Sequence, residues 1–217
     1  MTPRSISPFS NRFFGAATAL LLAACGGGTT QAEETASSVP YSVSEAGRFN
    51  EPWAMAFLPD GRALVTEKSG QLKLWRDKGN VTPVSGAPTA SSAGQGGLGD
   101  VVLHPDFARN RMVYLSWVEA EGDVKGAAVG RARLIEDSAG ARLDGLEIIW
   151  RQSPKVTGNG HFGHRIAFGP DGMLYISSGE RQKFDPAQDL TGNLGKIVRL
   201  NADGTVPADN PMAAKGG

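Results

Sequence analysis

The sequence predicts an all-β protein built from short strands and tight turns. The chain has 217 residues, including 29 glycines and 13 prolines, and hydrophobic residues still make up 40%. This composition favours many strands joined by turns over long helices, while leaving enough apolar residues for a core. From Tyr41 onward, short apolar stretches alternate with Gly, Pro and Asp turn signals, and this pattern recurs along the chain.

The first repeat contains three predicted strands, at residues 53–58, 63–66 and 71–75. Pro-Asp-Gly at 59–61 separates the first two, because proline presets φ, aspartate caps the turn and glycine accepts a positive φ. The stretch QLKLW at 71–75 alternates polar and apolar residues, as a half-buried strand does. The repeat is therefore strand, turn, strand, turn, strand.

The same unit returns twice, with predicted strands at 101–107 and 112–117, and then at 165–168, 173–178 and 194–200. Self-similar units of four strands are the signature of β-propeller blades. A β-sandwich with repetitive turns is the alternative. Blades take about 40–50 residues and a closed ring needs about four to eight, so residues 41–217 are expected to form an incomplete propeller of about three to four blades.

Residues 1–25 are predicted to be a signal peptide. Arg4 and Arg12 precede the apolar run 13–24, which is too short to cross a bilayer of about 30 Å as a helix. The run ends in Leu-Ala-Ala-Cys, which resembles a bacterial lipobox with Cys25 as the lipidated residue. The alternative is an ordinary signal peptide that is cut elsewhere, for instance after Ala32.

An exported, periplasmic lipoprotein is therefore expected, with membrane contact only through the lipid on Cys25. Residues 26–40 are small and polar and are predicted to be a flexible linker between the anchor and the domain. The 22 basic and 22 acidic residues balance, so no net charge attracts nucleic acid. The single cysteine excludes a disulfide within the chain.

Two of the three histidines lie in the glycine-rich segment 158–165 (GNGHFGHR). Glycines on both sides of His161 let the loop approach a ligand closely, and an imidazole can act as a general base near neutral pH. A surface histidine in a flexible loop is the alternative. His104 precedes Pro-Asp and is predicted to cap or pack against that turn.

A second glycine-dense loop, 91–100, contains Gln95, its one residue with a long hydrogen-bonding side chain. No Lys-Ser or Lys-Thr follows this loop, so a nucleotide site is not predicted. No His, Cys and Asp spacing fits zinc, and no Gly-x-Ser-x-Gly marks a serine hydrolase.

Four segments together resemble the glucose/sorbosone dehydrogenase family, whose soluble aldose sugar dehydrogenases are six-bladed propellers that use PQQ. They occur in the family's order and span most of residues 49–211. The matching segments are PWAMAFLPDG at 52–61, GQGGLG at 94–99 with LHPDF at 103–107, HFGHR at 161–165, and QDL at 188–190 through LGKIVRL at 194–200.

The resemblance implies oxidation of aldose sugars at the anomeric carbon to lactones. His161 matches the family's catalytic base, which takes the proton of the anomeric hydroxyl while hydride passes to PQQ. Cofactor contacts are expected from His161, Gln95 and Arg165. Sugar contacts are expected from Gln95, Glu180, Gln182 and Gln188; Glu180 either holds a sugar hydroxyl or orients His161, and which of the two later glutamines faces the sugar stays open.

Two departures from the family pattern affect these expectations. Relatives often have glycine at the position of His164, so we expect a more crowded approach to His161. The family's calcium ligands and the basic residues that hold the quinone carboxylates are expected beyond residue 217. Hence the chain by itself is expected to bind PQQ poorly.

The sequence leaves two alternative functions open and does not identify two of the reaction partners. A non-catalytic propeller lipoprotein that binds a sugar or a partner is one alternative function, since fold does not guarantee catalysis. A metal-dependent propeller lactonase is another, although it needs convergent carboxylates that the sequence does not show. The external electron acceptor and the specific aldose are not predicted.

Overall fold

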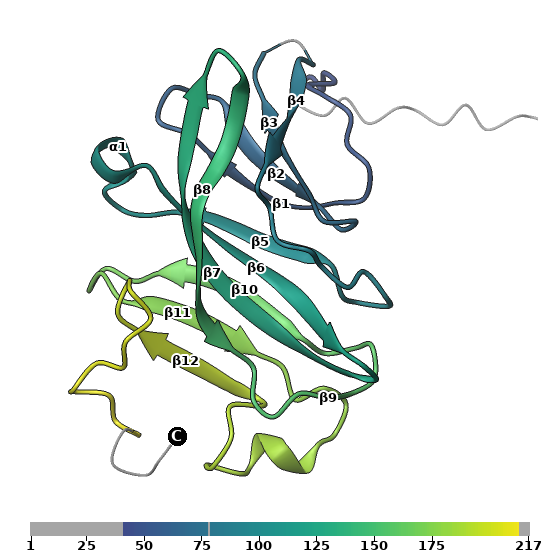
Figure 1. Ribbon diagram of the computed structural model, residues 1–217, viewed down its shortest axis with the longest axis vertical. Coiled ribbons are helices and arrows are strands. Elements are labelled where there is room, and N and C mark those ends of the chain that lie inside the picture. Colours follow the sequence, from purple (N-terminus) through teal and green to yellow (C-terminus); the bar gives the residue numbers. More distant parts are fainter. Residues whose placement is uncertain (1–40, 78, 213–217) are drawn as a thin grey trace, which may run out of the picture. The chain divides into compact units, whose positions relative to one another are not determined.

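The computed structural model describes residues 41–77 and 79–212, which are almost entirely strand and turn (Figure 1). These elements belong to one compact unit, Val43–Gly217. The predicted signal peptide, Cys25 and the 26–40 linker lie outside the described residues. Within the described ranges, no helix has the length and apolar character to cross a membrane.

The strands are β1 (Pro52–Phe57), β2 (Ala63–Glu67), β3 (Gln71–Trp75), β4 (Val81–Ser85), β5 (Leu98–Leu103), β6 (Met112–Glu121), β7 (Val124–Asp137), β8 (Gly140–Arg151), β9 (Val156–Thr157), β10 (Gly163–Phe168), β11 (Leu174–Ser178) and β12 (Lys196–Leu200), with the short helices α1 (Phe107–Asn110) and η1 (Asp185–Ala187).

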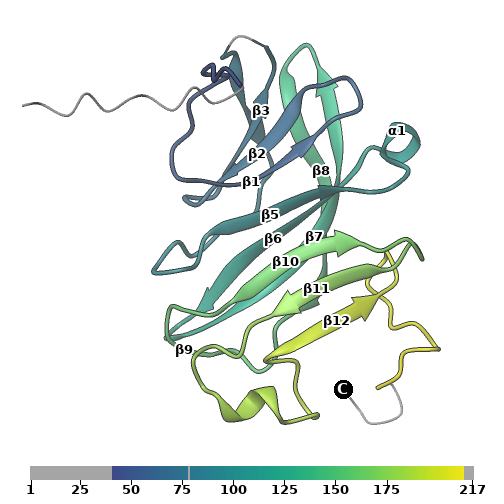
Figure 2. The same cartoon turned by 180° about the vertical axis from the view of Figure 1, so that it is seen from behind.

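The strands form three consecutive antiparallel meanders, β1–β4, β5–β8 and β10–β12. Both views show the middle meander between the other two (Figures 1 and 2). Its first strand, β5, contacts β1 on one side and β10 on the other. At the opposite edge, β4 pairs in parallel with β8 and joins the first two meanders into one sheet. The predicted fold class, an all-β incomplete propeller of repeated four-stranded units, is confirmed.

The middle meander buries both of its faces. In β6, Val113, Leu115 and Trp117 belong to the core shared with the first meander, whereas Tyr114 belongs to the core shared with the third. Successive side chains of a strand point to opposite faces, so a sheet between two others needs apolar residues at every position. This explains why residues 112–117 are apolar in the sequence except for Ser116, whose hydroxyl has hydrogen-bond partners in its buried position.

The structure differs from the sequence expectations in several places. Strand β4 was not predicted, and the strand expected at 101–107 ends at Leu103. The glycine loop predicted for 91–100 is shorter, because β5 already begins at Leu98. The long hairpin of β7 and β8 was not predicted at all. Its strands contain small and charged residues whose charges pair across the hairpin, such as Arg131 with Glu147 at 2.9 Å, and this hides the apolar alternation.

Each of the three neighbouring strands β1, β5 and β10 has an irregularity at its start. The register shifts between Pro52 and Ala54 in β1, between Leu98 and Val101 in β5, and between Gly163 and Ile166 in β10. Such bulges re-aim side chains and are common beside functional sites. The side chains displaced from regular alternation are Trp53, Asp100, His164 and Arg165.

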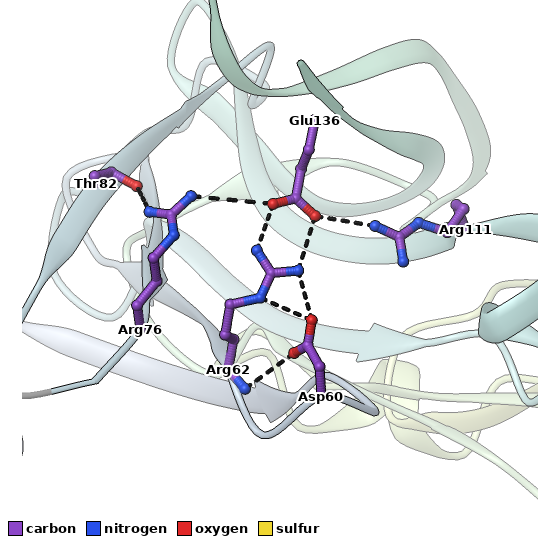
Figure 3. A network of polar contacts seen from close by, with 6 residues as sticks. All are labelled: Asp60, Arg62, Arg76, Thr82, Arg111 and Glu136. Carbon is purple, nitrogen blue, oxygen red and sulfur yellow. Dashed lines mark hydrogen bonds and ion pairs between the residues drawn. The ribbon is translucent and has the colours of Figure 1, made fainter. Parts of the chain in front are cut away.

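Glu136 on β7 ties the first two meanders together (Figure 3). Its carboxylate bonds to Arg62 Nη2 at 3.0 Å and to Arg111 Nη2 at 2.9 Å, and Arg76 Nη2 lies 4.0 Å away. Arg62 and Arg76 belong to the first meander and Arg111 directly precedes β6 of the second, so this carboxylate binds arginines from both meanders. The hydrogen bond from Arg62 lowers the pKa of Glu136.

Candidate active site

A pocket of about 380 Å³ lies where the starts of the three neighbouring strands meet. It draws on β1, the two glycine-rich loops and the start of β10, so segments more than 100 residues apart in sequence share it. The lining residues are Trp53, Lys68, Gly94, Gln95, Gly96, His161, Phe162, Gly163 and His164.

His161 and Glu180 form a hydrogen-bonded pair at this pocket. His161 Nδ1 contacts Glu180 Oε1, and the imidazole is 49% exposed. The other carboxylate oxygen accepts hydrogen bonds from the backbone N–H groups of Lys183 at 2.7 Å and Phe184 at 3.0 Å. The contact with His161, followed by these backbone bonds, lowers the pKa of Glu180 to about 2.

The pairing determines which nitrogen of His161 can act as a base. An ionised carboxylate only accepts hydrogen bonds, so Nδ1 of His161 carries the proton that Glu180 receives. The lone pair of the neutral ring is then on Nε2. Of the two roles expected for Glu180, the geometry favours orienting His161.

Gln95 holds the backbone of His161. The backbone N–H of His161 donates to Gln95 Oε1 at 2.7 Å, and the backbone N–H of Gln95 donates to the carbonyl of Asn159 at 2.8 Å. His161 itself has a φ of +49°, a left-handed conformation that requires such support. Gln95 thus lies at the site, and its side-chain Oε1 already accepts a hydrogen bond from the loop that carries His161.

Arg181 clamps the same loop from inside, and the sequence analysis missed it. The side chain is 1% exposed, and its guanidinium donates to the carbonyls of Gly160 at 2.9 Å, Gly158 at 2.7 Å and Lys125. Its charge also lies 3.7 Å from the centre of the Phe162 ring. Burial lowers the pKa of Arg181 to about 10, so it stays charged at neutral pH. Arg181 stands in a polar segment that looks solvated in sequence, so no local signal marked it.

Three other predicted site residues, Arg165, Gln182 and Gln188, are not among the residues that line the pocket. Arg165 is 64% exposed, 3.4 Å from Asp100 Oδ1, with its guanidinium 5.3 Å from the Trp53 ring. The amide of Gln182 lies over Gly160, where an ideal Cβ would come 2.7 Å from Gln182 Oε1. Gln188 follows η1, and none of the side-chain hydrogen bonds found among residues 41–77 and 79–212 links it to the pocket.

His164 points into the protein. Its Nδ1 lies 2.8 Å from Ser116 Oγ, and its ring stacks on Trp53 at 5.0 Å between centroids and 9° between planes. Within the described part of the chain, no hydrogen bond or ring contact joins His164 to His161. His164 thus forms part of the wall of the pocket that His161 also lines, and the expectation of a more crowded approach to His161 stays a prediction.

The remaining histidine has the expected structural role. His104 Nδ1 accepts the backbone N–H of Asp106 at 2.9 Å and lies 2.9 Å from Asn110 Nδ2, which confirms that it caps this turn. Across the described ranges, no group of three or more His, Cys, Asp or Glu residues is arranged to hold a metal ion.

Comparison with known proteins agrees with this fold. The sequence model of the family described as Glucose / Sorbosone dehydrogenase matches residues 49–217. Aldose sugar dehydrogenase YliI of Escherichia coli (strain K12) is 43% identical over 173 residues, which are 78% of this chain and 46% of that protein.

Solved structures give the same result. A crystal structure of a glucose dehydrogenase has a TM-score of 0.74 and 41% identity, covering 80% of this chain and 50% of its own. The PQQ-bound aldose sugar dehydrogenase of Streptomyces coelicolor has a TM-score of 0.67 and 34% identity, covering 76% and 49%. The chain spans about half the length of these relatives. It belongs to the glucose/sorbosone dehydrogenase family.

Proposed function

We propose that the protein oxidises aldose sugars at the anomeric carbon to lactones, with PQQ as cofactor and His161 as general base. The observation that carries the proposal is the His161–Glu180 pair at an open pocket, with Nε2 of His161 free to face a ligand. The similar proteins named aldose sugar dehydrogenase and the PQQ-bound neighbour support the substrate class and the cofactor.

In this proposal Nε2 of His161 takes the proton of the anomeric hydroxyl. The anionic carboxylate of Glu180 stabilises the imidazolium that results, as the carboxylate of a catalytic triad does. Gln95 and Arg181 bond to the N–H and the carbonyl of the peptide group that precedes His161 and so help to keep its ring in place. A positioned general base contributes about 10²- to 10⁴-fold to the rate.

The residues present fit a planar, anionic quinone. Trp53 and Lys68 line the pocket, and the guanidinium of Arg165 lies 5.3 Å from the Trp53 ring, so positive charge lies beside an aromatic wall. PQQ, when bound, would accept the hydride from the anomeric carbon. The calcium ion and the further basic residues expected for the family would be held by residues beyond 217, and this part of the proposal rests on the resemblance alone.

The test is a His161→Ala variant of the protein expressed from its complete gene, loaded with PQQ and calcium and assayed with D-glucose and an artificial electron acceptor. We expect kcat to fall at least about 100-fold while the fold is kept. His104→Gln is the matched control, because His104 is the histidine that caps a turn outside the pocket. Unchanged turnover in His161→Ala would overturn the proposal, and sugar binding without any oxidation by the wild type would favour a binding protein.

We propose in addition that the protein is exported and anchored in the membrane by a lipid on Cys25. The support is the order of charged, apolar and Leu-Ala-Ala-Cys segments in residues 1–25. Metabolic labelling with a radioactive fatty acid tests this, because label should enter the wild type and not Cys25→Ala. Equal labelling of both proteins would contradict the anchor.

A further inference from the structure

The buried ring of His164 has one nitrogen with no partner among the described residues. His164 is 1% exposed, and its single side-chain hydrogen bond joins Nδ1 to Ser116 Oγ. The described part of the chain contains no fully buried side-chain nitrogen or oxygen that lacks a partner. Since His164 lines the pocket, we infer that Nε2, on the opposite side of the ring from Ser116, is the atom that reaches the pocket surface.

The contacts of Ser116 indicate which nitrogen of His164 carries the proton. Ser116 Oγ already accepts the backbone N–H of Asp100 at 2.8 Å. Its own hydroxyl proton finds an acceptor in His164 Nδ1, which leaves both groups satisfied in a buried position. The neutral ring then carries its proton on Nε2, which is a hydrogen-bond donor facing the pocket.

The surrounding structure holds this ring in one orientation. Trp53 covers one face of the ring, and Gly99 leaves the space beside it, because an ideal Cβ on Gly99 would lie 2.1 Å from His164 Cε1. The backbone of His164 has a φ of +57°, which is unfavourable for a side chain of this size. Bulges in β1, β5 and β10 bring these residues together.

We propose that His164 is a second ligand-binding residue of this pocket, whose Nε2–H donates a hydrogen bond to an oxygen of the bound ligand. The acceptor is a sugar hydroxyl or an oxygen of the quinone, and this identity of the ligand rests on the proposed function. His161 and His164 then have complementary roles on one pocket wall, since His161 Nε2 accepts a proton and His164 Nε2–H donates a hydrogen bond.

Burial keeps His164 suited to that role. Desolvation, with the nearby charge of Arg165, lowers the pKa of His164 to about 4. The carboxylate of Asp100 also faces this region, but its oxygens accept the backbone N–H groups of Val101 and Ile166. A ring that is neutral at pH 7 donates from Nε2 without competing with His161 for the substrate proton.

The first measurement is histidine side-chain NMR of the ¹⁵N-labelled protein expressed from its complete gene. We expect a neutral, Nε2-protonated His164, whose Nε2 resonance shifts on titration with D-glucose alone or with PQQ alone. The ligand that causes the shift identifies the acceptor. If saturation with each ligand leaves that resonance unmoved, the inference is wrong.

Two variants provide the second measurement. His164→Phe keeps an aromatic ring for Trp53 but removes the donor, and His164→Gln keeps an amide donor. For the ligand that shifts His164, we expect the dissociation constant to rise about tenfold in His164→Phe, with partial recovery in His164→Gln. Wild-type affinity in a folded His164→Phe variant would overturn the inference.

The proposed function and the inference on His164 can be contradicted independently of each other. If His161→Ala abolishes oxidation while folded His164→Phe behaves as wild type, the inference on His164 is wrong and the proposed function stands. If D-glucose affinity depends on His164 in a protein that oxidises no aldose, the inference stands and the proposed function is wrong.

Discussion

The imidazole of His164 occupies the space that a side chain on Gly99 would need. An ideal Cβ on Gly99 would lie 2.1 Å from His164 Cε1 and 2.4 Å from Nδ1. The two residues lie on the neighbouring strands β5 and β10, so the absence of a side chain on one strand creates the site for a ring on the other.

This relationship predicts that Gly99→Ala destabilises the protein by about 1–3 kcal/mol through overpacking. In a His164→Gly background the same change should cost much less, because the clash is gone, and a double-mutant cycle in urea measures the difference. Gly192→Ala is the control, since its nearest contact would be an ordinary 3.4 Å from Ser153 O. Equal costs of Gly99→Ala in both backgrounds would contradict the packing described here.

Stability should fall between pH 6.5 and pH 4 because His164 is buried. Burial lowers its pKa from an ordinary value of 6.5 to about 4 in the folded protein. Between these two pH values the unfolded chain binds a proton at His164 and the folded chain does not. The contribution of the neutral ring to the stability of the fold is therefore complete above pH 6.5 and is lost as the pH falls toward 4. At about 1.4 kcal/mol per pKa unit the loss approaches about 3 kcal/mol.

Urea denaturation at pH 7.5 and pH 5.0 measures this loss. The difference between the two free energies of unfolding should be smaller in His164→Phe than in the wild type. His104, whose pKa burial also lowers, is present in both proteins and cancels in the comparison. The same pH dependence in both would show that His164 does not titrate as described.

Replacing Glu180 by glutamine should reduce kcat/KM by about tenfold to 100-fold while leaving the fold intact. An amide oxygen can still accept from His161 Nδ1, but it lacks the charge that stabilises an imidazolium. Steady-state kinetics with D-glucose measure the effect, and Glu121→Gln, an exposed carboxylate paired with Lys155 elsewhere, is the control. Full activity in Glu180→Gln would mean that Glu180 does not assist His161.

Arg181→Lys should destabilise the protein by about 2 kcal/mol or more. A single ammonium group cannot reproduce a planar guanidinium that donates to three separate carbonyls, and carbonyls left unpaired inside the protein are costly. Hydrogen exchange of the amides in residues 158–162 should accelerate. Arg109→Lys, whose side chain is 79% exposed, should have almost no effect, and similar behaviour of the two variants would contradict the clamp.

Glu136→Gln should cost about 1–3 kcal/mol, because Arg62 and Arg111 lose the charged acceptor that joins two meanders. The lowered pKa of Glu136 means that its contribution is present above the unfolded pKa, near 4.5, and is lost as the pH falls further. Thermal unfolding at pH 7 measures the cost. Glu147→Gln is the control, since Glu147 is more exposed and pairs with one arginine, so its loss should cost less than about 1 kcal/mol.

Local patterns in the sequence were sufficient for the family and for most strands of the first and third meanders. Residues 71–75 alternate polar and apolar residues and form β3 with those same bounds, because a two-residue period depends only on neighbours along the chain. His161 was also a candidate from local sequence, because glycines lie close to it on both sides. The hairpin of β7 and β8 escaped detection because its pattern of charges makes sense only when the two strands are paired.

The assembly of the site depends on contacts between segments that are far apart in the sequence. His161 meets Glu180 across 19 positions, Ser116 meets His164 across 48, and Arg62 meets Glu136 across 74. The inward position of His164 and the role of Arg181 depend on the same kind of contact. Burial and the choice of partners arise only when distant segments pack together. Local backbone preference, and the set of residues available for those contacts, can be read directly from the order of residues along the chain.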